Sequence, residues 1–233
     1  MNQRIDTSFD VRSDAAGKDP DQHSATLRRY HQLLWSKPLP NGIGFDLDVT
    51  TPSVYLHHKS DLGEFELSSD SIVHPYDYWI RTEDLIKQIP QVELDEFNNI
   101  GSTVGAYLVF PSNVIAGGQT INMARGRSRK VDDRIDLTLE CIRRHYQGEK
   151  SPLASTLALY NEFFSLFGDF DHYVEFFLLQ DLVSDDGAVK FFLPFDDFAT
   201  PTLPGTVEEY QAYRALVTRF VAARNDRINS LFG

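Results

Sequence analysis

The 233-residue chain is predicted to fold as an α+β protein, with a small, mostly antiparallel sheet in its first half packed against a helix-rich second half. Two observations predict this class. Short runs of alternating apolar and polar residues lie between positions 43 and 67, a pattern typical of half-buried strands. After position 130, apolar residues recur at helical spacing. Because aromatic residues make up 12% of the chain, we expect a core built on rings.

Residues 1–23 are expected to form an N-terminal arm, because turn-forming residues interrupt this stretch, and residues 24–233 a single globular domain. Ser24 or Thr26 is positioned to cap a first helix. The elements predicted to follow are strands at 43–49, 54–58 and 64–67 with a hairpin turn at 61–63, helices at 82–88 and 94–99, and a strand at 104–110.

The second half is predicted to be mainly helical. One apolar stripe spans residues 131–146, and a second spans 153–167 after the helix-start signal Ser151-Pro152. Thr206 and Glu209 form a capping box for a final helix. Residues 172–183 fit either a buried helix or the first strand of a hairpin. The helix is favoured, followed by a strand at 189–193.

Composition and charge restrict the class of partner. The formal net charge of −12 argues against binding to duplex nucleic acid. The single cysteine, Cys141, cannot form an intrachain disulfide, and we expect it to be structural. With no apolar N-terminal run of the signal-peptide kind and no membrane-length apolar stretch, the chain is expected to be cytoplasmic and to have no membrane partner. Composition sets no oligomeric state.

One basic segment stands out in this acidic chain. Between Arg125 and His145 there are seven Lys or Arg residues and four Asp or Glu residues. Guanidinium groups before a helix suit a phosphate, so the first hypothesis is that the segment binds a phosphate-bearing small ligand such as a nucleotide. The residues predicted to bind it are Asn122, Arg125, Arg127, Arg134 and Arg144.

This first hypothesis requires that at least two arginines of the segment converge on one cleft, with Asn122 within reach. The alternative is a solvated basic loop whose arginines pair with some of the 34 acidic side chains. A second hypothesis for the whole protein is a non-enzymatic acidic interaction or inhibitor protein that docks on a basic partner. That hypothesis predicts a contiguous carboxylate face instead of a polar pocket.

The predicted hairpin supplies the candidate acid–base residues, His57 and Glu66. Its Glu-x-Glu pair beside Ser68 resembles the motif of ADP-ribosyltransferases, although in those enzymes the serine motif precedes the glutamates. On the helix after the basic segment, Asp133 shares one face with further carboxylates, which fits a divalent cation or solvated ion pairs. The ion-pair interpretation is favoured, so no metal site is predicted. No sequence motif names a cofactor.

Several segments together carry a resemblance to a known family. They include YLHHKSDLGEFELSSDSI at 55–72, TINMARG at 120–126, DLTLECIRRHY at 136–146 and FFLLQDLVSDDGAVKFFLPFDDF at 176–198. Over nearly its whole length the chain resembles a family of uncharacterised bacterial proteins classed as a domain of unknown function. The resemblance implies a complete single-domain protein and brings no activity with it.

Overall fold

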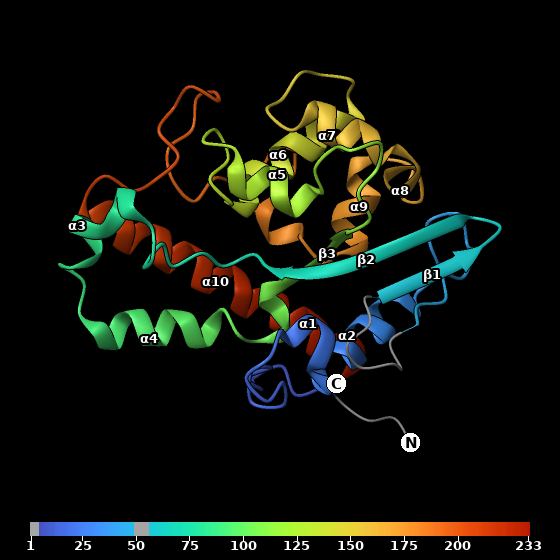
Figure 1. The fold of residues 1–233 in the computed structure, drawn as a ribbon, viewed down its shortest axis with the longest axis horizontal. Helices are drawn as coiled ribbons and strands as arrows, with labels where there is room; N and C mark the ends of the chain where they lie inside the picture. Colours follow the sequence, from blue (N-terminus) through green and yellow to red (C-terminus); the bar gives the residue numbers. More distant parts are fainter. Residues whose placement is uncertain (1–4, 49–55) are drawn as a thin grey trace.

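A three-stranded antiparallel sheet forms the framework of the first half (Figure 1). The computed structural model describes residues 5–48 and 56–233. Strand β1 (Leu56–Ser60) pairs with β2 (Gly63–Ser71), and β2 pairs with β3 (Tyr107–Pro111). Together with the helix-rich remainder, the sheet confirms the predicted α+β class. The predicted hairpin turn is also confirmed, with Gly63 at a φ of 128° where the second strand begins.

Two predicted strands are wrong. Residues 43–47 have no strand structure, and Asp48 forms a single isolated bridge with His57. The residues predicted as strand at 49 and 54–55 lie outside the described residues. At 189–193, Val189 makes only one isolated bridge, with Val183. In both places, within the described residues, a single bridge forms and no neighbouring strand continues the ladder.

The helices of the first half are short, and α4 (Gln91–Ile100) packs against α10 (Val207–Phe232) (Figure 1). Ser24 caps α2, because its hydroxyl oxygen accepts a hydrogen bond from the Leu27 amide at 3.1 Å. The predicted strand at 104–110 begins with a 3-10 turn and becomes β3 only at Tyr107. The helical elements are α1 (Pro20–His23), α2 (Ala25–Trp35), η1 (Ile80–Thr82), α3 (Glu83–Ile86), α4 (Gln91–Ile100) and η2 (Val104–Ala106).

The second half is helical, as predicted. Thr206 caps α10 through the Glu209 amide, which confirms the predicted start of the final helix. The predicted stripe at 153–167 forms two helices that break at Tyr160, whose hydroxyl donates to the Asn113 carbonyl at 2.8 Å. The elements are α5 (Ile121–Arg127), α6 (Ile135–Tyr146), α7 (Ala154–Leu159), α8 (Asn161–Ser165), α9 (Phe170–Phe176), η3 (Gln180–Leu182) and α10 (Val207–Phe232).

The core is built on aromatic rings around Trp35 of α2. This side chain is 1% exposed, and the centroids of five Phe rings lie 4.3 to 6.3 Å from its ring. The N-terminal segment joins the same core, since Val11 is fully buried and its amide donates to the Ser102 carbonyl at 2.9 Å. No helix in the described ranges has the length and apolar composition needed to cross a membrane.

One buried cation fixes the C-terminal helix to the rest of the molecule. Arg224 of α10 is fully buried. Its guanidinium donates to the carbonyl oxygens of Gly105 and Tyr107, both at 2.7 Å, and of Phe177 at 3.1 Å. It also donates to the Tyr30 hydroxyl at 3.0 Å. In Figure 1, α10 runs from α3 at one end of the molecule to the region of α1 and α2. Arg224 therefore joins α10 to α2, to the start of β3 and to the segment after α9.

Glycine 105 shows how closely these elements approach. A Cβ atom at this position would lie 2.5 Å from the side-chain oxygen of Asn225 and 3.0 Å from the Val221 carbonyl. The Gly105 amide donates to that Asn225 oxygen at 2.8 Å. Only a residue without a side chain lets α10 reach the backbone before β3.

We predict that Arg224→Met destabilises the protein by about 3 kcal/mol or more, because buried carbonyl oxygens lose the charged donor that they accept from. Arg219→Met is the matched control, since Arg219 is an exposed arginine of the same helix. Its expected cost is below about 0.5 kcal/mol. Denaturant unfolding at pH 7 measures both variants. Equal midpoints for the two would contradict the role given to Arg224.

A second prediction concerns His31, which is fully buried in α2. Burial, and after it the charges of Arg224 and Arg28, lower the pKa of His31 from 6.5 to about 3. Because the pKa of His31 is lower in the folded state, the stability contributed by the neutral, buried imidazole is fully present above pH 6.5. It is lost as the pH falls toward 3. From pH 7 to pH 5 the loss is about 2 kcal/mol.

The measurement is denaturant unfolding of wild type and His31→Phe at both pH values. The variant should lack about 2 kcal/mol of the pH dependence seen in wild type. If the two proteins lose the same stability between pH 7 and pH 5, the buried imidazole is not the titrating group.

Candidate functional site

The basic segment forms a short helix and a strained turn. Thr120 caps α5 by accepting a hydrogen bond from the Met123 amide at 3.2 Å. The chain then turns through residues 128–134 before α6 begins at Ile135. Within the turn, Asp132 and Asp133 have φ values of 46° and 61°, a left-handed conformation that aspartate tolerates better than most residues. The turn places carboxylates inside the molecule, next to the arginines of the same segment.

Arg125 lies inside the protein and is neutralised there. Its side chain is fully buried, with Nε 3.1 Å from Oδ1 of Asp133 and Nη1 3.4 Å from Oδ2 of Asp70. Nη2 donates to the Asp133 carbonyl at 3.0 Å. The guanidinium carbon also lies 5.3 Å from the centre of the Phe110 ring. Arg125 therefore ties α5 to β2, β3 and the turn before α6.

Arg134 is buried in a separate pair. Its Nε donates to Oδ1 of Asp136 at 3.1 Å, and its Nη1 to the Thr202 carbonyl at 3.0 Å. Asp136 in turn accepts a hydrogen bond from the Phe192 amide at 2.8 Å. Both partners of this ion pair are fully buried. The pair links α6 to the segments around residues 192 and 202.

The expected convergence of Arg125 and Arg134 on one cleft does not occur. The two side chains pair with different carboxylates, and their donors are directed at protein oxygens. Arg144 is half-buried, with Nε 2.6 Å from Oε1 of Glu140. Of the predicted ligand-binding residues, Asn122 is half-buried, and within the described ranges its Oδ1 has no hydrogen-bond partner.

The hairpin residues are close neighbours on the sheet. His57 and Glu66 are directly opposite each other in the register of β1 and β2. His57 Nε2 lies 3.1 Å from Oε1 of Glu64, and this pair is exposed. Neither His57 nor Glu66 lines the cavity of about 600 Å³ beside Arg127 that is described below.

A cluster that sequence reasoning did not find lies beside Arg125. His74 is 6% exposed. Its Nδ1 accepts from the Tyr76 amide at 3.1 Å, and its Nε2 lies 3.0 Å from the Tyr78 hydroxyl and 3.8 Å from Oδ2 of Asp133. Burial raises the pKa of Asp70 to about 6, against the opposing charge of Arg125. Burial also lowers the pKa of His74. The cluster combines a carboxyl group whose pKa is raised to about 6 with a structural role around Arg125.

Arg127 is one of the arginines of this segment that are exposed to solvent. Arg127, the last residue of α5, is exposed and lines a cavity of about 600 Å³ between α5, the loop at 118–119 and α7. Within the described ranges it makes no ion pair with a carboxylate. The other lining residues are Gly118, Gln119, Ala124, Ser128, Pro152, Leu153, Ser155, Thr156 and Leu159.

The chemistry of this lining is unusual for so acidic a protein. One cation, three hydroxyls and one amide line the cavity, and none of its lining residues is Asp or Glu. Four other cavities in the described chain each have at least one carboxylate in their lining. Gly118 allows the loop at 118–119 to approach Leu159 closely, since a Cβ atom at position 118 would lie 2.5 Å from the Leu159 side chain.

Two other chemistries have little support here. Cys141 of α6 is fully buried, and burial raises the pKa of its thiol to about 12, so the thiolate needed for nucleophilic attack is disfavoured. In the parts of the chain that the structure describes, no three His, Cys, Asp or Glu side chains are grouped as metal ligands.

Comparison with known proteins gives one result. Residues 5–228 match the model of a family of unknown function, DUF6994, so the chain belongs to that family. This confirms the resemblance seen in the sequence. No curated protein and no solved structure matches the chain. Any functional assignment therefore rests on the site itself.

We predict that Arg134→Met destabilises the protein by about 3–5 kcal/mol, because it leaves the buried Asp136 carboxylate without its cation. The double variant Arg134→Met/Asp136→Asn should recover part of the loss, since the unpaired charge is removed. Arg129→Met, at an exposed arginine of the same segment, should change stability by less than about 0.5 kcal/mol. Denaturant titration separates these outcomes. An Arg134→Met variant as stable as Arg129→Met would show that the buried pair is not needed.

Proposed function

We propose that this protein binds a phosphate-bearing small ligand, such as a nucleotide, in the Arg127 cavity. This site differs from the one expected from the sequence, because its lining has one arginine instead of two and does not include Asn122. The observation that carries the proposal is the lining: an exposed, unneutralised guanidinium beside hydroxyls, without a carboxylate, in a chain of net charge −12. The positive charge of Arg127 would attract a small anion to this place, where no carboxylate of the lining repels it.

The polar groups suit phosphate oxygens. A guanidinium can donate two parallel hydrogen bonds to a phosphate, and such charge-assisted bonds are about twice as strong as neutral ones. The hydroxyls of Ser128, Ser155 and Thr156 and the amide of Gln119 are further donors for the remaining oxygens. Leu153 and Leu159 offer an apolar wall for the rest of the ligand.

The proposal is for binding and includes no reaction. Apart from Arg127, none of the residues lining the cavity is titratable, so the site supplies no general acid or base. His57 and Glu66 remain acid–base candidates only for a ligand that extends beyond this lining.

The test is a thermal-shift screen with inorganic phosphate, nucleotides and the matching nucleosides. A ligand at 100 times its Kd adds about 2.7 kcal/mol to stability. We expect nucleotides or phosphate to raise the Tm and nucleosides to leave it unchanged. Arg127→Ala should weaken binding at least about tenfold, the effect of one charge-assisted bond.

Arg129→Ala is the control, since it removes the same charge from an exposed position that does not line the cavity. Equal loss of affinity in both variants would mean that the segment attracts anions only through its net charge. The absence of any shift with phosphate or nucleotides would overturn the proposal.

The acidic interaction protein is the second candidate, and one surface favours it. Tyr78 and Ile80 are 74% and 89% exposed, in a loop that also presents Asp77 and continues to the exposed Glu83 and Asp84. Exposed apolar side chains near carboxylates are complementary to a partner that combines basic and apolar residues.

A peptide of alternating lysine and leucine is the probe for this second candidate. The docking surface would be supported if the double substitution Tyr78→Ser/Ile80→Ser abolished peptide binding while Arg127→Ala left it unchanged. Binding that survives the double substitution would exclude it.

A further inference from the structure

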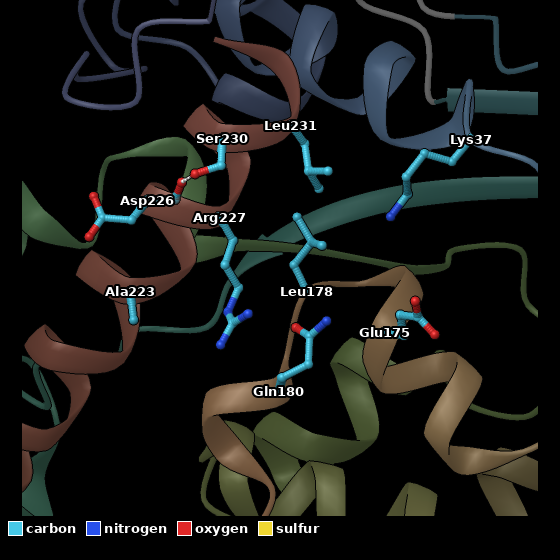
Figure 2. A pocket seen from close by; sticks show the side chains of 9 residues that line it. All are labelled: Lys37, Glu175, Leu178, Gln180, Ala223, Asp226, Arg227, Ser230 and Leu231. Atoms are coloured by element: carbon cyan, nitrogen blue, oxygen red, sulfur yellow. Dashed lines mark hydrogen bonds between the residues drawn. The ribbon is translucent and has the colours of Figure 1, made fainter.

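A second cavity lies against the C-terminal helix, and its lining, unlike that of the Arg127 cavity, includes carboxylates. Its volume is about 620 Å³, and its lining comes from α10, from the segment at 175–180 and from Lys37, which follows α2 (Figure 2). Figure 2 shows the Lys37 amine directed toward Leu178, with Leu231 of α10 nearby. The cavity has cationic, anionic and apolar groups together in its wall.

Lys37 supplies a cation with free hydrogen-bonding capacity. Its Nζ donates to the Phe176 carbonyl at 2.6 Å and lies 4.6 Å from the centre of the Phe176 ring. An ammonium group has three N–H donors, so two remain. No carboxylate of the described residues lies within ion-pair distance of Lys37, whereas Arg227 in the same wall is paired with Asp181 at 2.7 Å. An incoming carboxylate would therefore pair with Lys37.

Acceptors face the same cavity from the other side. Gln180 lines it, and the Oε1 atom of this side chain is buried, with no hydrogen-bond partner in the described parts of the chain. A buried acceptor without a donor costs about 1–3 kcal/mol, which a donor on a ligand would relieve. Glu175, an exposed carboxylate of α9, lines the cavity as well. Together they suit an ammonium group.

The apolar part of the wall includes a leucine with a left-handed backbone conformation. Leu178 follows the end of α9 with a φ of 58°, a left-handed conformation that usually selects glycine at this position. Leu178 is 4% exposed and Leu231 is 55% exposed. Both line the cavity and give it an apolar wall.

We propose that this cavity binds a small zwitterion with an apolar side chain, of amino-acid or dipeptide size. The ligand carboxylate pairs with Lys37, its ammonium group donates to Gln180 and faces Glu175, and its side chain lies against Leu178 and Leu231. This site is separate from the Arg127 cavity, because the two linings share no residue.

Isothermal titration with four probes tests the proposal. L-Leucine and the dipeptide Leu-Leu carry both charges, and their relative affinities distinguish the two ligand sizes. 4-Methylpentanoate lacks the ammonium group, and 3-methylbutylamine lacks the carboxylate. We expect at least one zwitterion to bind at least about tenfold more tightly than either singly charged analogue, since each analogue loses one charge-assisted interaction.

Variants assign the binding to this cavity. Lys37→Met keeps most of the aliphatic stem and should weaken zwitterion binding at least about tenfold, whereas Lys37→Arg should retain most of it. Glu175→Gln is a second, exposed change that should also weaken binding. Lys150→Met, at an exposed lysine outside the lining, and Arg127→Ala should both leave it unchanged.

Three outcomes would overturn the proposal. The first is that neither zwitterion gives a heat of binding. The second is that 4-methylpentanoate binds as tightly as leucine. The third is that both Lys37→Met and Glu175→Gln bind leucine as tightly as the wild type does.

Discussion

The hydrogen bonds that Arg224 donates to backbone carbonyls hold the two halves of this protein together. They bring the start of β3, the end of α9 and Tyr30 of α2 to one point on the C-terminal helix. The same charge acts on its surroundings. After burial, it is the next cause that lowers the pKa of His31 to about 3 and that of Lys37 to about 8. Burial, reinforced by this buried cation, thus keeps the imidazole in the core neutral at pH 7 and lowers the pKa of the amine at the cavity of Figure 2.

Arg125 and Arg134 act on the same principle with carboxylates in place of carbonyls. A buried charge without a partner is costly, so each guanidinium requires its acceptors to be brought to it by the fold. The left-handed turn at Asp132 and Asp133 meets that requirement for Arg125. Because these cations are used inside the molecule, Arg127 is left as the arginine that a ligand in the neighbouring cavity can reach.

Features that depend on neighbouring residues were predicted well. The caps at Ser24 and Thr206 and the hairpin turn at Gly63 are set by side chains a few residues away, so local pattern reveals them. The strand predicted at 43–49 failed because alternation shows only which face is apolar, and a strand also needs a partner. For the site, the sequence marked the basic segment but could not show that Ser155 and Thr156 lie across a cavity from Arg127.

The sequence by itself determined the α+β class, the helix-rich second half, the family and the acidic charge with its single basic segment, because these are properties of composition and short-range periodicity. Only the tertiary structure decided which arginines are internal and which is open to a ligand. The pairing of Arg125 with Asp70 joins residues on β2 and α5, and the bond from Arg224 to Gly105 joins α10 to the backbone before β3. Whether a charge faces water or a buried acceptor depends on such contacts between distant segments, which no local pattern encodes.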